Sequence, residues 1–141
     1  MRLLRVGDFG KETVAALDAK GKIREVWKYI EDLNPDTINF NNLKKLESLN
    51  LDELPEIDVK KRIGACINRP SNILCIGLNY SLHAKQTGSK LPTYPIVFNK
   101  SPDCIQGPFD PIKKNKFQKK LDYEVELAVL IGKEAKNVEE K

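Results

Sequence analysis

The alternation of apolar and polar positions over the first thirty residues predicts a small antiparallel sheet. Short apolar runs occupy residues Arg2–Val6, 14–17 and 23–27, which are lengths typical of strands. The segment between the last two runs, Asp18-Ala-Lys-Gly-Lys22, contains the glycine that a short hairpin turn favours. We therefore expect three short strands, the last two joined as a hairpin.

The periodicity changes over residues 34–55. Apolar positions recur there at helix-like spacing among asparagine, lysine and glutamate, namely Leu43, Leu46, Leu49 and Leu54. This stretch predicts a short helix followed by a linker, and it closes a small N-terminal, β-rich domain over residues 1–60.

After Asp58 the pattern again favours strands, which we expect over residues 63–67, 73–77, 96–98 and 123–131. A two-turn helix is expected over residues 79–88, with Gly88 as its stop. Prolines between residues 92 and 111 favour turns and keep the strand at 96–98 short. The sequence thus predicts a mixed α+β fold in which β-structure dominates, with a second domain over residues 61–141.

Composition excludes several classes of protein. The chain has 141 residues, 40% of them hydrophobic and 31% charged, as in ordinary globular proteins. Its longest apolar run, residues 127–131, is far shorter than the roughly 20 residues that span a bilayer, so no membrane partner is expected. The net charge of +4 is modest. Residues 113–120 hold five lysines but one aromatic, Phe117, which favours a solvated hairpin loop over a nucleic-acid site.

The three cysteines, Cys66, Cys75 and Cys104, show neither the spacing of a metal site nor an even number for disulfides. Cys66 and Cys75 lie in apolar runs. We therefore expect buried free thiols in a reducing compartment, and hence a cytoplasmic location.

The sharpest chemical signal lies in residues 121–132. In a strand, Asp122, Glu124 and Glu126 would share one face, while Val125 and Leu127 would lie in the core on the other. Carboxylates this close repel each other when partly buried, and a bound cation removes that cost. Glu124 and Glu126 could both bind one ion, and oxygen ligands suit Mg²⁺, Mn²⁺ or Ca²⁺. An ordinary half-exposed sheet with a polar face explains the spacing equally simply.

Two further residues are candidates for chemistry. His83, the only histidine, follows the apolar strand at 73–77 on a strand-to-helix segment, where polar side chains commonly face a cleft. Lys100 comes directly after the strand at 96–98, where a cation could pair with an anionic substrate. The alternative for His83 is a surface or helix-capping residue, and the alternative for Lys100 is a lysine in solvent at the end of a strand.

Four ordered motifs carry a family resemblance. They are Ile76-Gly-Leu-Asn-Tyr-Ser-Leu-His-Ala84, Pro95-Ile-Val-Phe-Asn-Lys100, Gly107-Pro-Phe-Asp-Pro111 and residues 121–133. Over roughly residues 60–141 the chain resembles the fumarylacetoacetate hydrolase family. The N-terminal strand and hairpin also resemble the bacterial members called ureidoglycolate lyases or diketo-deoxy-sugar-acid hydrolases.

The resemblance implies a fold, a cofactor and an activity. It implies a small N-terminal domain followed by the first part of a β-roll, in a homodimer. It also implies that Glu124 and Glu126 bind Mg²⁺ or Mn²⁺ together with an aspartate beyond Lys141. His83 would then move a proton and Lys100 would bind the substrate. We expect a hydrolase or lyase that cleaves C–C bonds of small 2-oxo or 1,3-dioxo acids through an enolate.

Two departures from the family pattern matter. Many members have a glutamate three residues after the histidine, and this chain has Gln86, which brings no negative charge to an imidazolium. The third metal ligand is absent from the chain, and residues 137–141 resemble a helix start that stops after one turn. We therefore expect the front part of a longer enzyme. The alternative is a truncated, non-catalytic fragment or partner subunit.

Overall fold

The computed structural model describes residues 1–58 and 60–140, and it divides into two compact units. Unit 1 comprises Met1–Asn68 and Gln106–Lys141, and unit 2 comprises Arg69–Ile105. The described residues form five strands in two small sheets and only two short α-helices. The predicted mixed α+β class, in which β-structure dominates, is therefore confirmed. The β-roll and the domain boundary near residue 60 stay predictions.

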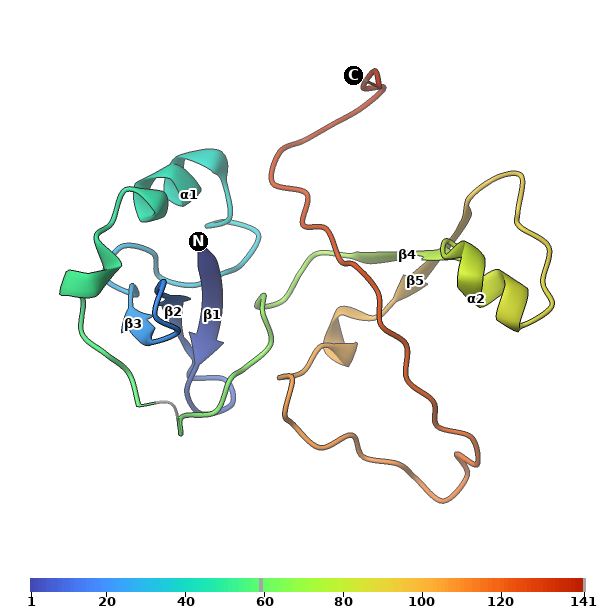
Figure 1. Ribbon diagram of the computed structural model, residues 1–141, viewed down its shortest axis with the longest axis horizontal. Helices are drawn as coiled ribbons and strands as arrows, with labels where there is room; N and C mark the ends of the chain where they lie inside the picture. Colours follow the sequence, from blue (N-terminus) through green and yellow to red (C-terminus); the bar gives the residue numbers. More distant parts are fainter. Residues whose placement is uncertain (59, 141) are drawn as a thin grey trace. The chain divides into compact units, whose positions relative to one another are not determined.

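Unit 1 is built on the predicted three-stranded antiparallel sheet, with β1 (Arg2–Val6), β2 (Thr13–Leu17) and β3 (Ile23–Glu25) in that order (Figure 1). In the β2–β3 turn, the Asp18 carboxylate accepts hydrogen bonds from the backbone N–H groups of Lys20 and Lys22, both at 2.8 Å. Gly21 has φ +79°, a left-handed conformation in which a side chain would be strained. The local sequence therefore fixes the hairpin.

Both edges of this sheet are covered by single bridges to later residues. Ile63 bridges Val6 on β1, and Glu56 bridges Arg24 on β3. These bridges leave less open edge for pairing with other chains. They also explain why the predicted strand at 63–67 is wrong. Only Ile63 pairs with the sheet, since the chain then turns away and the Asn68 N–H donates to the Leu33 carbonyl at 2.7 Å.

The helix α1 (Phe40–Glu47) packs on one side of the sheet. Asn39 caps it by accepting a hydrogen bond from the Asn42 N–H, and Leu46 is its buried residue. Leu46 joins a core cluster with Val14 and Ala16 of β2. Ala15, between them, points to the opposite cluster around Val6, Ile23 and Ile57. β2 is thus buried on both faces, which the small side chains of Ala15 and Ala16 allow. The short 3₁₀ helix η1 (Leu51–Glu53) follows α1.

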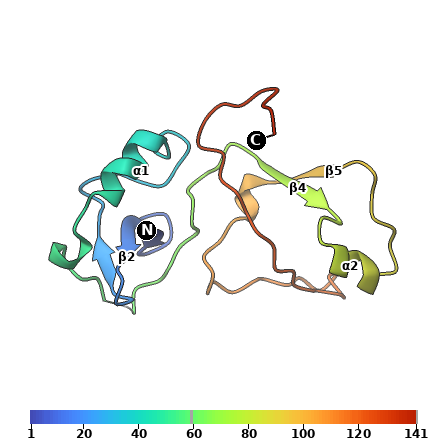
Figure 2. The ribbon, with the colours of Figure 1, turned by 45° about the horizontal axis from the view of Figure 1, so that its top comes forward.

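Unit 2 is a β-hairpin with a helix at one end. β4 (Ile73–Gly77) pairs antiparallel with β5 (Ile96–Lys100), and α2 (Ser81–Gln86) lies between them in the chain (Figures 1 and 2). The 3₁₀ helix η2 (Pro102–Cys104) follows β5. All three predicted elements of this region are present, but α2 covers less than the expected residues 79–88, and β5 runs two residues farther than expected. Every residue of β5 is exposed.

The predicted strand at 123–131 is not present. These residues form no helix or strand, and Val125 and Leu127, expected in the core, are 86% and 82% exposed. A strand needs a neighbour for its backbone hydrogen bonds, and none of the described strands pairs with this segment. The lysines at 113–120 are exposed as expected, but without the second strand they form no hairpin loop.

Two smaller expectations also fail. Cys66 and Cys104 are exposed and Cys75 is half-buried, so the free thiols are not core residues. The helix start is not seen over residues 137–140, where Asn137 has φ +51° rather than the extended backbone of an N-cap. Lys141 lies outside the described residues. In the described part of the chain, no helix has the length and apolar character needed to cross a bilayer.

Candidate functional site

His83 lies in the middle of α2, and the local sequence fixes both ends of that helix. Before it, Leu78 adopts a left-handed φ of +54°, which turns the chain sharply out of β4. After it, the Ser89 N–H donates to the Ala84 carbonyl at 2.8 Å and the Gly88 N–H donates to the Lys85 carbonyl at 3.2 Å. These two bonds form a Schellman cap, with Gly88 at the left-handed position. The imidazole is exposed, as is Gln86 one turn later.

Lys100 is the last residue of β5 and is exposed. The register pairs Gly77 with Ile96 at the end from which α2 begins, and Ile73 with Lys100 at the other end. At about 3.4 Å per residue, these two ends are roughly 14 Å apart along the strands. Within unit 2, Lys100 therefore sits at the end opposite to the start of the histidine helix.

Glu124 and Glu126 belong to unit 1 and are both exposed, in the segment that forms no strand. The predicted shared strand face is therefore wrong for this chain. Among the described residues, no group of three or more histidine, cysteine, aspartate or glutamate side chains could hold a metal ion. The two carboxylates have the donor chemistry that Mg²⁺ and Mn²⁺ prefer, but they make up only part of a ligand set. Their role as ligands stays a prediction.

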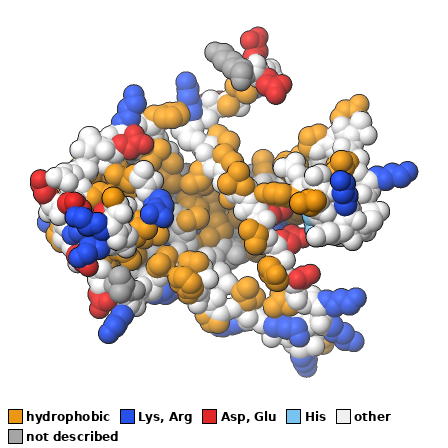
Figure 3. Space-filling model, in the orientation of Figure 1, with side chains coloured by type: hydrophobic (Ala, Val, Ile, Leu, Met, Phe, Trp, Pro, Cys, Tyr) orange, Lys and Arg blue, Asp and Glu red, His pale blue; other side chains and the backbone are white. Residues whose placement is uncertain are grey.

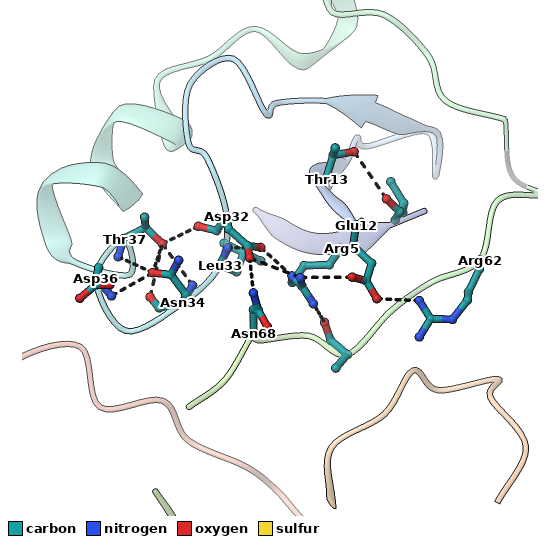
Figure 4. Close-up of polar contacts among 12 residues, drawn as sticks. Arg5, Glu12, Thr13, Asp32, Leu33, Asn34, Asp36, Thr37, Arg62 and Asn68 are labelled. Carbon is teal, nitrogen blue, oxygen red and sulfur yellow. Dashed lines mark hydrogen bonds and ion pairs between the residues drawn. The ribbon is translucent and has the colours of Figure 1, made fainter. Parts of the chain in front are cut away.

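A charge network that the sequence did not reveal lies in unit 1. The Arg5 guanidinium sits between two carboxylates, with its Nε 2.6 Å from Asp32 Oδ1 and its Nη2 3.4 Å from Glu12 Oε2 (Figure 4). Asn68 Nδ2 donates to Asp32 Oδ2 at 2.7 Å. Arg5 and Glu12 are both nearly buried. Each buried charge is therefore paired, as burial requires.

The network lowers the pKa of both carboxyl groups. Burial alone would raise the pKa of Glu12, but the hydrogen bond from Arg62 and the charges of Arg5 and Arg62 outweigh it. Burial likewise opposes the hydrogen bonds from Arg5 and Asn68 at Asp32, and the pKa of Asp32 is again lowered overall. Both groups thus favour the charged form in the folded chain.

Arg62 extends this network to the motif Gly107-Pro-Phe-Asp-Pro111. Its Nη1 is 2.7 Å from Glu12 Oε1, and its Nε and Nη2 donate to the two oxygens of Asp110 at 2.8 and 2.6 Å. The hydrogen bond from Arg62 lowers the pKa of Asp110. Asp110 also accepts the Gly107 N–H at 2.8 Å. A Cβ at Gly107 would overlap the Ile63 carbonyl oxygen, so only glycine fits there.

We call the contact among Arg62, Gly107 and Asp110 the Arg62 anchor. It holds residues 107–110, near the start of the second stretch of unit 1, against Arg62 in the first stretch of the same unit. The motif containing Gly107 and Asp110 was visible in the sequence, but its role was not. The partners are 48 residues apart, and no local periodicity predicts such a pair.

Comparison with known proteins decides the family. Residues 72–141 match the family described as "Fumarylacetoacetate (FAA) hydrolase C-terminal". The chain belongs to the fumarylacetoacetate hydrolase family. The matched residues include His83, Lys100, Glu124 and Glu126 as well as the Gly107–Asp110 part of the Arg62 anchor. Members of the fumarylacetoacetate hydrolase family commonly use divalent metal ions.

Several bacterial proteins are similar to nearly the whole chain. Relatives from Burkholderia ambifaria and Burkholderia multivorans are each 41% identical over 140 residues, and one from Burkholderia lata is 40% identical. Their names all begin "Putative hydrolase". Each match covers 99% of this chain and 50% of the relative. The chain thus spans about half the length of the curated relatives it matches.

Proposed function

We propose that this chain provides the His83, Lys100, Glu124 and Glu126 side chains of a metal-dependent hydrolase or lyase acting on small 2-oxo or 1,3-dioxo acids. The observation that carries the proposal is the family match over residues 72–141, because it includes all four candidate side chains. The name of the relatives, hydrolase, supports the reaction class. The narrower resemblance to ureidoglycolate lyases or diketo-deoxy-sugar-acid hydrolases, and the homodimer, belong to the same proposal.

Each side chain has one role in this proposal. Glu124 and Glu126 hold a Mg²⁺ or Mn²⁺ ion, with the remaining ligand coming from outside the described residues. When bound, such an ion supplies positive charge to the oxygens of the oxo acid. Lys100 pairs with the substrate carboxylate through a charge-assisted hydrogen bond. The imidazole of His83 accepts or donates a proton at the substrate, and Gln86 lies one helical turn away on the same helix.

The test is a chimera in which this whole chain replaces the matching half of the Burkholderia ambifaria relative. We expect cleavage of acylpyruvates that depends on Mg²⁺ or Mn²⁺ and is lost with EDTA. His83→Ala should lower kcat by about 10²–10⁴-fold, the usual contribution of general acid–base catalysis, while the affinity for Mn²⁺ stays unchanged. Glu124→Gln and Glu126→Gln should instead weaken Mn²⁺ binding.

Lys113→Ala is the control, because Lys113 is exposed and has no role in the proposal. It should leave both activity and metal binding as in the unaltered chimera. A folded chimera that cleaves acylpyruvates without a divalent ion would refute the metal role of Glu124 and Glu126. One that shows full activity with His83→Ala would refute the role of the histidine.

A further inference from the structure

A strongly basic surface lies at residues 114–120, which we call the basic loop. Its charged side chains are Lys114, Lys116, Lys119 and Lys120, and it contains no acidic residue. The whole chain has 24 basic and 20 acidic residues, so outside the basic loop the two kinds are equal at 20 each. The net charge of +4 therefore comes from this one loop. Figure 3 shows blue side chains gathered at the lower right, where Figure 1 places this stretch of the chain.

The positive charge of the basic loop is not neutralised by ion pairs. All residues of the loop are exposed, and its lysines form no ion pair within the part of the chain that the structure describes. The acidic residues that flank the loop in the sequence are engaged elsewhere. Asp110 is held by Arg62, and Asp122 accepts the Tyr123 N–H. The loop is therefore available to an anionic partner.

A tight turn at the centre of the basic loop is built by local hydrogen bonds. The side-chain oxygen of Asn115 accepts the N–H groups of Phe117 and Gln118 at 2.9 and 3.1 Å. In return, Gln118 Oε1 accepts the Asn115 N–H at 2.8 Å. Asparagine favours such turns because its side chain can replace a backbone acceptor. Lys116 and Phe117 occupy the central positions of the turn and form the tip of the loop.

The tip combines a charge with an exposed aromatic ring. Phe117 is 78% exposed, and Lys116 Nζ lies 5.1 Å from the centroid of its ring, within the range of a cation–π contact. Two more exposed apolar side chains flank the loop, Ile112 before it (67%) and Leu121 after it (55%). The surface therefore presents apolar groups between and beside its lysines, and a partner must accommodate both.

This combination favours the surface of an anionic lipid bilayer over a nucleic acid. Basic clusters are attracted to anionic headgroups, and apolar side chains beside them enter the boundary between headgroups and acyl chains. Proteins that bind single-stranded nucleic acids stack several aromatic rings on successive bases. The basic loop has one aromatic ring and no arginine.

We propose that the basic loop binds the surface of anionic lipid bilayers, with its lysines at the headgroups and Phe117 in the boundary layer beneath them. The sequence predicted no membrane partner because no apolar run is long enough to span a bilayer, but binding at the surface needs no such run. The Arg62 anchor holds the chain at Asp110, shortly before the loop, and the Asn115 turn fixes its tip. This preorganisation lowers the entropy lost on binding. The proposal is independent of the proposed catalytic activity.

The test is sedimentation of the 141-residue chain with vesicles made of equal parts of phosphatidylcholine and phosphatidylserine. We expect the chain to sediment with these vesicles and to stay in solution with vesicles of phosphatidylcholine alone. Raising the ionic strength from about 0.1 M to about 1 M shortens the Debye length from about 10 Å to about 3 Å. This change should release most of the bound chain.

Matched variants locate the contact. Lys119→Gln combined with Lys120→Gln removes two charges from the loop and should weaken binding roughly thirtyfold, at about fivefold for each lysine. Lys44→Gln combined with Lys45→Gln makes the same change at an exposed pair on α1 and should leave binding nearly unchanged. Phe117→Ala keeps the charge of the loop and should weaken binding by about tenfold, because the ring no longer enters the bilayer.

Four results would overturn the proposal. The first is that the chain does not sediment with the phosphatidylserine vesicles. The second is that the two double lysine variants bind these vesicles equally well. The third is that Phe117→Ala binds as tightly as the unaltered chain, since charge alone would then explain the attraction. The fourth is that polyuridylate binds the chain more tightly than the vesicles do, because the partner would then be a nucleic acid.

Discussion

The packing of α1 on the N-terminal sheet depends on one side chain, and its removal should cost a defined amount of stability. Leu46 is the buried residue of α1 and is 1% exposed. Leu46→Ala removes three carbon atoms, worth about 2.4 kcal/mol at roughly 0.8 kcal/mol for each. The cavity left between α1 and β2 adds to this cost. We therefore expect a loss of about 3 kcal/mol in the free energy of unfolding, within the usual range of roughly 2–5 kcal/mol.

Leu43→Ala provides a matched control for this prediction. It makes the same chemical change in the same helix, but Leu43 is only half-buried, so about 1 kcal/mol should be lost. The helix propensity gained is the same in both variants. The difference between them therefore isolates the contact of Leu46 with the core.

Urea unfolding followed by the fluorescence of Trp27 measures both variants. Trp27 is the only tryptophan of the chain and directly follows the buried Val26, so its emission reports on unit 1. The midpoint should fall in Leu46→Ala with no change in slope. In a thermal scan, the melting temperature should fall by roughly 10–20 °C. Equal losses in the two variants, or a loss below about 1 kcal/mol in Leu46→Ala, would refute the docking of α1 through Leu46.

Three further predictions concern charge and catalysis. Because the pKa values of Glu12 and Asp32 are lowered by folding, their contribution to stability is complete at neutral pH and is lost as the pH falls below roughly 4.5. Acid titration should therefore unfold unit 1, and Glu12→Gln should make its stability less dependent on pH. The 141-residue chain alone should show little or no metal-dependent turnover of acylpyruvates, because two carboxylates bind Mg²⁺ poorly; robust turnover would show that no further ligand is needed. In the chimera, Gln86→Glu places a carboxylate one helical turn from His83 and should move the acidic limb of kcat/KM to higher pH, because a nearby anion stabilises positive charge on the base. An unchanged profile would show that residue 86 does not act on the histidine.

The elements that the sequence alone determined are those whose stabilising contacts join residues close together in the sequence. The strands of the first sheet, the Asp18–Gly21 turn and the helix α2 with its Gly88 cap all depend on side chains and hydrogen bonds a few residues apart. Local periodicity and turn chemistry are sufficient to predict such elements. The four motifs were likewise sufficient to predict the family, because they are recognised from the identity and order of their residues alone.

Only the tertiary structure decided the features that join distant parts of the chain. Arg62 pairs with Asp110, 48 residues farther along the chain. Ala15 is buried on one face of β2 and Ala16 on the other. Both features depend on contacts between segments that are far apart in the sequence. The same reason explains the wrong prediction at residues 123–131. Alternation shows that a segment can form a strand, but the strand exists only where a neighbour accepts its backbone hydrogen bonds. None of the five strands that the structure describes pairs with residues 123–131.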